Sequence, residues 1–97
     1  QTYNAYAIIQ SNGDIANSNN LFTAATTANP GELVCTWNNV QPDAGYVVLV
    51  SVFGAAGRAA TSHTLTTTGF VVRAWEGTSG SAIAVTVQCL RSDVPFN

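Results

Sequence analysis

The sequence contains very little charge. Only 8% of its 97 residues are Asp, Glu, Lys or Arg, compared with about 25% in an ordinary globular domain. Lys is absent, so the basic side chains are Arg58, Arg73 and Arg91. Binding to nucleic acid or to an anionic membrane surface needs clustered basic residues. Three separated arginines in a chain of net charge −2 therefore argue against both kinds of partner.

Other missing features narrow the possibilities further. No apolar run approaches the roughly 18 residues that a membrane-spanning helix requires, so membrane insertion is not expected. The first residues, QTYNAYAI, have neither the charged region nor the apolar core of a signal peptide. The chain contains no Met, and we expect it to be a segment of a longer protein. Its length predicts a single domain over residues 1–97.

The sequence offers little for catalysis or metal binding. It has one His, two Cys and five carboxylates, without a GxSxG motif or a closely spaced Cys pair. Most of the carboxylates fall in expected turns or at strand edges. The single histidine, His63, cannot hold a metal ion without ligands from elsewhere. We therefore predict that the protein is not an enzyme and uses neither a metal ion nor a cofactor.

Cys35 and Cys89 each lie within a strand-like alternation, in the sequences LVCTW and IAVTVQC. Two interpretations are open. The two thiols are either buried and free, acting as small hydrophobic side chains, or joined in a disulfide that links two strands. The sequence favours free thiols, and it does not fix the cellular compartment.

Turn signals and β-forming residues alternate along the chain. Val and Thr are abundant, and no stretch keeps a 3.6-residue apolar period over three turns. Turns are expected at Asn12-Gly13, at Asn29-Pro30-Gly31 and within residues 41–45 and 76–81. Six to eight short strands between such turns predict an all-β fold, a small antiparallel β-sandwich.

Residues 45–53, GYVVLVSVF, are apolar on both faces of the strand that they predict. A strand with one solvated face alternates apolar with polar residues, so a second layer must cover this one. A chain of 97 residues has little left to supply that layer. We therefore predict that other copies of the chain cover it. The predicted oligomer interface comprises Val47, Leu49, Phe53 and Val71.

Trp75 and Glu76 end a predicted strand next to a Gly-Ser loop. An aromatic ring beside a carboxylate suits a sugar, whose ring stacks while its hydroxyls donate. Packing of Trp75 at a contact between chains is the competing interpretation, which Val71 on the same strand face favours. Arg58 lies in a loop of Gly and Ala residues. It is either a contact residue or a solubilising charge.

The opening AYAIIQSNGDIANSNNL resembles the start of a domain found at the C-terminal ends of many bacteriophage tail fibres. The resemblance continues through PGELVCTWNNV, QPDAGYVVLVS and TLTTTGFVVRAW, and it spans nearly the whole chain. The family's first strand is led by aromatic residues where this chain has AYAII, and the cysteines are not part of the family pattern. The positions that carry the resemblance are Asn12, Gly13, Ser18, Asn19, Gly31, Tyr46, Gly69 and Phe70.

This resemblance implies a tip domain that forms a homotrimer at the far end of a virion's tail fibre and acts outside the cell. It implies a non-enzymatic attachment function, with a host surface polysaccharide or outer-membrane protein as the receptor. A monomeric immunoglobulin-like or carbohydrate-binding module and a purely structural trimerisation cap are the alternatives. The receptor contacts that we expect lie in two loops, residues 54–60 and 76–81, and the expected receptor-binding residues are Arg58, Trp75, Glu76, Thr78 and Ser79.

Overall fold

The computed structural model describes residues 3–54 and 56–97. Nine β-strands, and no helix, occur within these residues. The strands are β1 (Asn4–Ile9), β2 (Ile15–Ser18), β3 (Phe22–Thr26), β4 (Glu32–Trp37), β5 (Val47–Val52), β6 (Ala59–His63), β7 (Gly69–Glu76), β8 (Ser79–Gly80) and β9 (Val85–Leu90).

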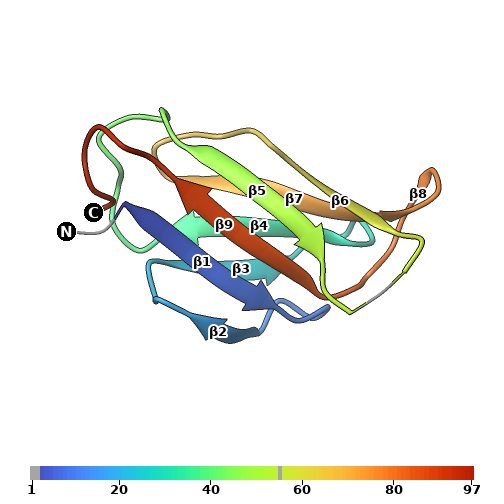
Figure 1. Ribbon diagram of the computed structural model, residues 1–97. Helices are drawn as coiled ribbons and strands as arrows, with labels where there is room; N and C mark the ends of the chain where they lie inside the picture. Colours follow the sequence, from blue (N-terminus) through green and yellow to red (C-terminus); the bar gives the residue numbers. More distant parts are fainter. Residues whose placement is uncertain (1–2, 55) are drawn as a thin grey trace.

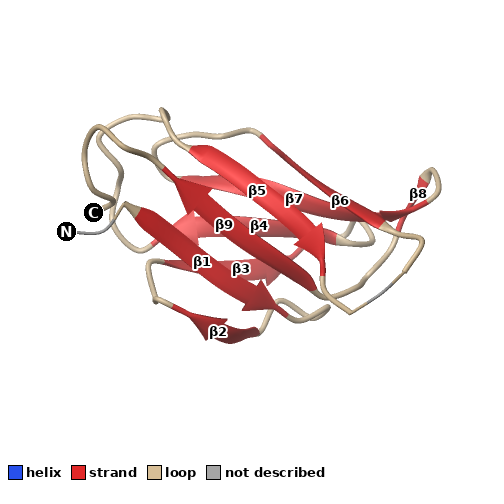
Figure 2. Ribbon diagram, viewed as in Figure 1, coloured by secondary structure: helices blue, strands red, loops and turns tan. Residues whose placement is uncertain are grey.

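The strands form two antiparallel sheets packed face to face (Figures 1 and 2). Sheet A has the order β2-β1-β9-β5, and sheet B has the order β3-β4-β7-β6, with the short β8 paired to the end of β7. The start of β1 and the C-terminus lie at one end of the sandwich, and the β7–β8 hairpin projects from the other (Figure 1). The predicted all-β antiparallel sandwich is confirmed.

The turns follow the residues that favour them. Gly13, with φ of 92°, lies between β1 and β2, and Gly31, with φ of 77°, lies between β3 and β4. These positive φ values suit glycine. Gly31 has a second constraint, since a Cβ atom there would lie 2.7 Å from the carbonyl oxygen of Ala74 on β7. The turn before β4 therefore packs directly on the neighbouring strand.

The core lies between the central strands of the two sheets. Alternate residues of β1 and β9 in sheet A, and of β4 and β7 in sheet B, point inward and are buried, because successive side chains of a strand point to opposite faces. Burial of this apolar surface is the main stabilising contribution. The inward residues of these strands are Ala5, Ala7, Ile9, Leu33, Cys35, Trp37, Phe70, Val72, Ala74, Val85, Val87 and Cys89.

An aromatic cluster closes the end of the core where the chain termini lie. Trp37 stacks on Phe96 with ring centroids 4.9 Å apart and meets the edge of Phe70 at 5.6 Å. The Tyr46 hydroxyl accepts a hydrogen bond from Trp37 Nε1 at 3.2 Å and donates one to the carbonyl oxygen of Thr66 at 2.7 Å. Buried polar atoms need such partners, so the cluster is fixed in orientation as well as packed.

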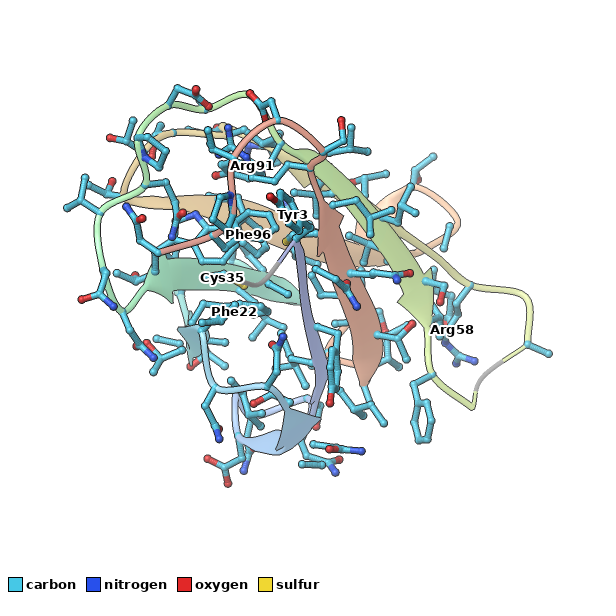
Figure 3. The ribbon with its side chains drawn as sticks, turned by 60° about the vertical axis from the view of Figure 1, so that its left-hand side comes forward. Tyr3, Phe22, Cys35, Arg58, Arg91 and Phe96 are labelled. Atoms are coloured by element: carbon cyan, nitrogen blue, oxygen red, sulfur yellow. The ribbon has the colours of Figure 1, made fainter. Side chains whose placement is uncertain are left out.

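Arg91 ties the end of β9 to the loop before β5. Its side chain is buried, and its Nη2 lies 2.9 Å from the Asp43 carboxylate and 3.1 Å from that of Asp93. Figure 3 shows Arg91 above Phe96, close to Tyr3 and far from Arg58. One of the three arginines therefore serves the fold, a role that the sequence pattern did not predict.

Candidate recognition surfaces

The outward side of sheet A is an uncharged surface, which we call the neutral face. The strand register places Tyr6 of β1, Gln88 of β9 and Leu49 of β5 in one row across the sheet. Parallel rows lie on either side of it. The neutral face comprises Tyr6, Ile8, Asn17, Val47, Leu49, Ser51, Thr86, Gln88 and Leu90, and none of these side chains carries a charge.

Large apolar side chains of the neutral face and of the adjoining turn are exposed. Val47 is 57% exposed, and Leu49 and Phe53 are each 50% exposed. The chain therefore leaves the Val47 and Leu49 side of β5 uncovered, as the sequence pattern predicts, while Val48 and Val50 pack against the core. Isolated exposed apolar residues are ordinary, but a contiguous group indicates a contact surface.

A hollow of about 310 Å³ lies on the neutral face. Tyr6 and Ile8 line one side of it and Leu49 lines the other. Polar atoms are contributed by Gln88 and by a hydroxyl pair, Ser51 and Thr86, whose oxygens are 2.5 Å apart. This mixture of aromatic, aliphatic and uncharged polar groups is typical of the centre of a protein interface.

Val71, the fourth predicted interface residue, lies elsewhere. It belongs to β7 in sheet B, where it is only half-buried and pairs with Val34 of β4 and His63 of β6. Its side chain points outward on the opposite side of the sandwich from Leu49. The predicted interface therefore divides between two surfaces, because the sequence gives the direction of a side chain on its strand but not the sheet to which the strand belongs.

The outward side of sheet B is different, and we call it the charged face. Glu32 of β4, Arg73 of β7 and Thr61 of β6 form one row across it. The face comprises Glu32, Val34, Thr36, Thr61, His63, Val71, Arg73 and Trp75.

Arg73 and Trp75 are held as a stacked pair. The guanidinium carbon of Arg73 lies 4.4 Å from the centre of the Trp75 ring, and Arg73 Nε donates to the carbonyl oxygen of Pro30 at 3.3 Å. Trp75 Nε1 donates to the Thr61 hydroxyl at 3.1 Å. Gly80 on β8 leaves room for the arginine, since a Cβ atom there would lie 2.6 Å from Arg73 Nη2. The cation–π contact and these hydrogen bonds orient both side chains.

Glu32 presents a carboxylate in the same row. It accepts hydrogen bonds from the Thr27 hydroxyl at 2.8 Å and from Asn29 Nδ2 at 3.2 Å. These two bonds lower the pKa of Glu32 below its usual value, with the larger effect from Thr27 and the smaller from Asn29. The positive charge of Arg73 acts in the same direction. The carboxylate is therefore fixed and ionised beside a fixed guanidinium.

The structure separates two residues that the sequence analysis joined. Successive residues of a strand point to opposite faces, so Trp75 lies on the charged face while Glu76 turns away and pairs with Arg58 at 2.5 Å. Figure 3 shows Arg58 at the end of the molecule opposite Arg91. Thr78 and Ser79 lie at the exposed tip of the β7–β8 hairpin. The carboxylate in the Trp75 region is that of Glu32, which the sequence analysis missed.

The expected contact loop at residues 54–60 is described in part. Residue 55 lies outside the described residues, and residues 59 and 60 belong to β6. Gly54 and Gly57 have φ of 75° and 73°, and a Cβ atom at either position would meet no atom within 4 Å. Glycine therefore serves here to bend the backbone and not to make room for a neighbouring group.

Cys35 and Cys89 are free thiols, each fully buried on an inward position of facing sheets. Burial raises the pKa of Cys35 to about 12 and raises that of Cys89 as well, with a further contribution from Cys35. Because the thiolate is the reactive form, both are unreactive in the folded protein. Of the two interpretations left open by the sequence, the structure has the free thiols.

The titratable groups are engaged in local contacts. Within residues 3–54 and 56–97, no three His, Cys, Asp or Glu side chains are grouped to hold a metal ion, and no helix in these ranges is long and apolar enough to cross a membrane. His63 Nδ1 lies 2.7 Å from the Thr64 hydroxyl. Each carboxylate has a hydrogen-bond or ion-pair partner: Asp14, Glu32, Asp43, Glu76 and Asp93.

No protein-family model, curated protein or solved structure matches this chain. A functional proposal therefore depends on the chemistry of the neutral and charged faces.

Proposed function

We propose that this domain is a non-enzymatic attachment module of the tail-fibre tip type, which self-associates as a homotrimer and binds a receptor on a host cell surface. The observation that carries the proposal is the exposed apolar group Val47, Leu49 and Phe53 on an uncharged side of the sandwich. Water contact with such a group is unfavourable, so association that covers it is stabilising.

The composition of the neutral face supports contact with another copy of the chain. Interface centres are rich in aromatic residues and poor in charged ones, and Tyr6, Leu49 and Gln88 form such a centre around the hollow. A closed ring of three copies joins two different patches of each chain. The neutral face supplies one patch, and its strand β5 lies at the edge of sheet A.

We assign the opposite side of the sandwich to the receptor. The charged face, which the β7–β8 hairpin adjoins, carries Trp75, Arg73 and Glu32. These groups offer a receptor an aromatic surface together with hydrogen-bond donors and acceptors. The partner set of the proposal is the domain itself together with a host surface polysaccharide or outer-membrane protein.

Sedimentation of the isolated domain tests the self-association. We expect a trimer of 10.1 kDa chains at micromolar concentration, with dissociation on dilution. A monomer at every concentration would overturn the assembly part of the proposal. Adsorption of the labelled domain to a panel of bacterial strains tests the attachment part, and saturable binding to at least one strain is the expected result.

A further inference from the structure

We infer that the charged face is a glycan-binding platform whose ligand is a neutral, hydroxyl-rich sugar chain. Arg73, Glu32 and Trp75 are the residues that would hold it. This inference rests on the proposed function, because it names the receptor class. It also moves the contact from the exposed hairpin tip, Thr78 and Ser79, to the side of sheet B.

The first observation is a donor group that is already oriented. Arg73 uses Nε to bind the Pro30 carbonyl oxygen and lies over the Trp75 ring. Among the described residues, no acceptor forms a hydrogen bond with either of its terminal nitrogens, so these remain for a ligand. A side chain that is fixed before binding loses little conformational freedom when the ligand arrives.

The second observation is an acceptor in the same row. Glu32 lies opposite Arg73 in the strand register, and Thr27 and Asn29 hold its carboxylate. A hydroxyl group both donates and accepts hydrogen bonds, so it matches a surface with a donor beside an acceptor.

The arrangement of charge selects a neutral ligand over a charged one. Glu32 disfavours an anion at this face, and so does the net charge of −2. Arg73 disfavours a cation. The two opposite charges lie next to each other, so their fields largely cancel at a distance while each still forms strong hydrogen bonds at contact.

The third observation is the length of the surface. Along β7, the outward residues run from Gly69 through Val71 and Arg73 to Trp75, which is about 20 Å at 3.3 Å per residue. At the Gly69 end lies a hollow of about 200 Å³, lined by four threonines together with apolar side chains such as Val34 and Val71. At the other end lies Trp75, which is partly buried and has the Arg73 guanidinium over its ring, and aromatic rings are surfaces on which a sugar can pack. A chain of several sugar units therefore fits better than a single one.

Binding of the intact domain to an array of neutral and acidic oligosaccharides tests the inference. We expect binding to neutral glycans only. For the best of them, Arg73→Gln and Trp75→Ala should each weaken binding measured by calorimetry by about 10-fold or more. Arg58→Gln, which removes a charge at the hairpin end, is the matched control and should change binding by less than about 3-fold. Trp75→Phe, which keeps an aromatic ring, should retain part of the affinity.

The same variants separate this inference from the proposed function. Far-UV circular dichroism and sedimentation first establish that each variant is folded and self-associates like the parent domain. The inference is wrong if no neutral glycan binds, if only acidic glycans bind, or if binding survives both Arg73→Gln and Trp75→Ala. If the domain still self-associates and adsorbs to cells in those cases, the attachment proposal stands and the receptor is of another class, such as an outer-membrane protein.

Discussion

The two sheets bury their inner faces in the same way but present different outer faces. Across sheet A the central row is Tyr6, Gln88 and Leu49, and across sheet B it is Glu32, Arg73 and Thr61. Inward, both sheets contribute alternating apolar residues to one core. The fold therefore does not distinguish the two sides, and the outward residues alone decide what each side can bind.

The distribution of charge sharpens this contrast. The chain has eight charged residues, three arginines and five carboxylates. Glu32, Arg73, Arg58 and Glu76 lie on the charged face or at its hairpin end, while the neutral face has none. In a protein with so little charge, the side that lacks it entirely is suited to contact with other protein surfaces.

The largest effect is expected on self-association, when a charge is placed on the neutral face. Leu49→Arg places a charge beside the hollow, where association would remove it from water, so the dissociation constant of the trimer should rise more than about 100-fold. Val34→Arg is the matched control, since Val34 is a valine 39% exposed on the charged face. Sedimentation measures both. A trimer that Leu49→Arg leaves unchanged would show that the neutral face is not the interface.

A smaller effect is expected from crowding the charged face. Gly80→Ala forces a Cβ atom against the Pro30 carbonyl and Arg73 Nη2, and this overpacking should lower the free energy of unfolding by roughly 1–3 kcal/mol. Gly54→Ala also costs stability because φ is 75° there, but it meets no atom within 4 Å. Denaturant unfolding gives the stabilities. The Trp75 indole NMR signal should shift in Gly80→Ala only, and an unchanged signal would contradict the packing argument.

The pH response should also differ between the two faces. The folded pKa of Glu32 is lowered, so the stabilisation from its hydrogen bonds is complete above the unfolded pKa near 4.5 and is lost as the pH falls through the lower folded value. Glycan binding should weaken over the same range, because the protonated group is a poorer acceptor. NMR titration of Glu32 checks this, and Thr27→Val should raise its pKa.

Self-association provides the contrast in the same titration. The neutral face contains no Asp, Glu or His side chain, and these are the side chains that ordinarily change charge in the acidic range. The sedimentation behaviour should therefore stay constant as the pH falls from neutral through the range in which Glu32 takes up its proton. A trimer that dissociates in step with Glu32 protonation would place the charged face in the interface.

Local pattern in the sequence predicted much of the fold. The strand-like alternation around Cys35 and Cys89 marked the positions of β4 and β9, and Asn-Gly and Pro-Gly marked two turns. The face to which each side chain points follows from the two-residue period of a strand. The exposed side of β5 was also predicted. Apolar residues occupy both faces of this strand, and so short a chain cannot cover both of them.

What the sequence could not provide was pairing between distant segments. Glu32 and Arg73 are neighbours only because β4 lies beside β7, and Val71 lies apart from the other predicted interface residues because β7 belongs to sheet B. The pairing of Arg91 with Asp43 depends in the same way on how the tail returns to the loop before β5. In contrast, the separation of Trp75 from Glu76 was readable from the strand period alone, and that signal was overlooked.

The smallest effect is expected at the hairpin end, where Arg58 pairs with Glu76. Their side chains are 33% and 58% exposed, and an ion pair in water adds little because solvent and salt screen it. Glu76→Gln should change the free energy of unfolding by less than about 0.5 kcal/mol and leave neutral-glycan binding within about 3-fold.

The same substitution at Glu32, Glu32→Gln, should weaken that binding clearly, because the fixed acceptor loses its charge. If Glu76→Gln has the larger effect on glycan binding, the ligand contacts the hairpin end, as the sequence predicted, and the platform on sheet B is not the site.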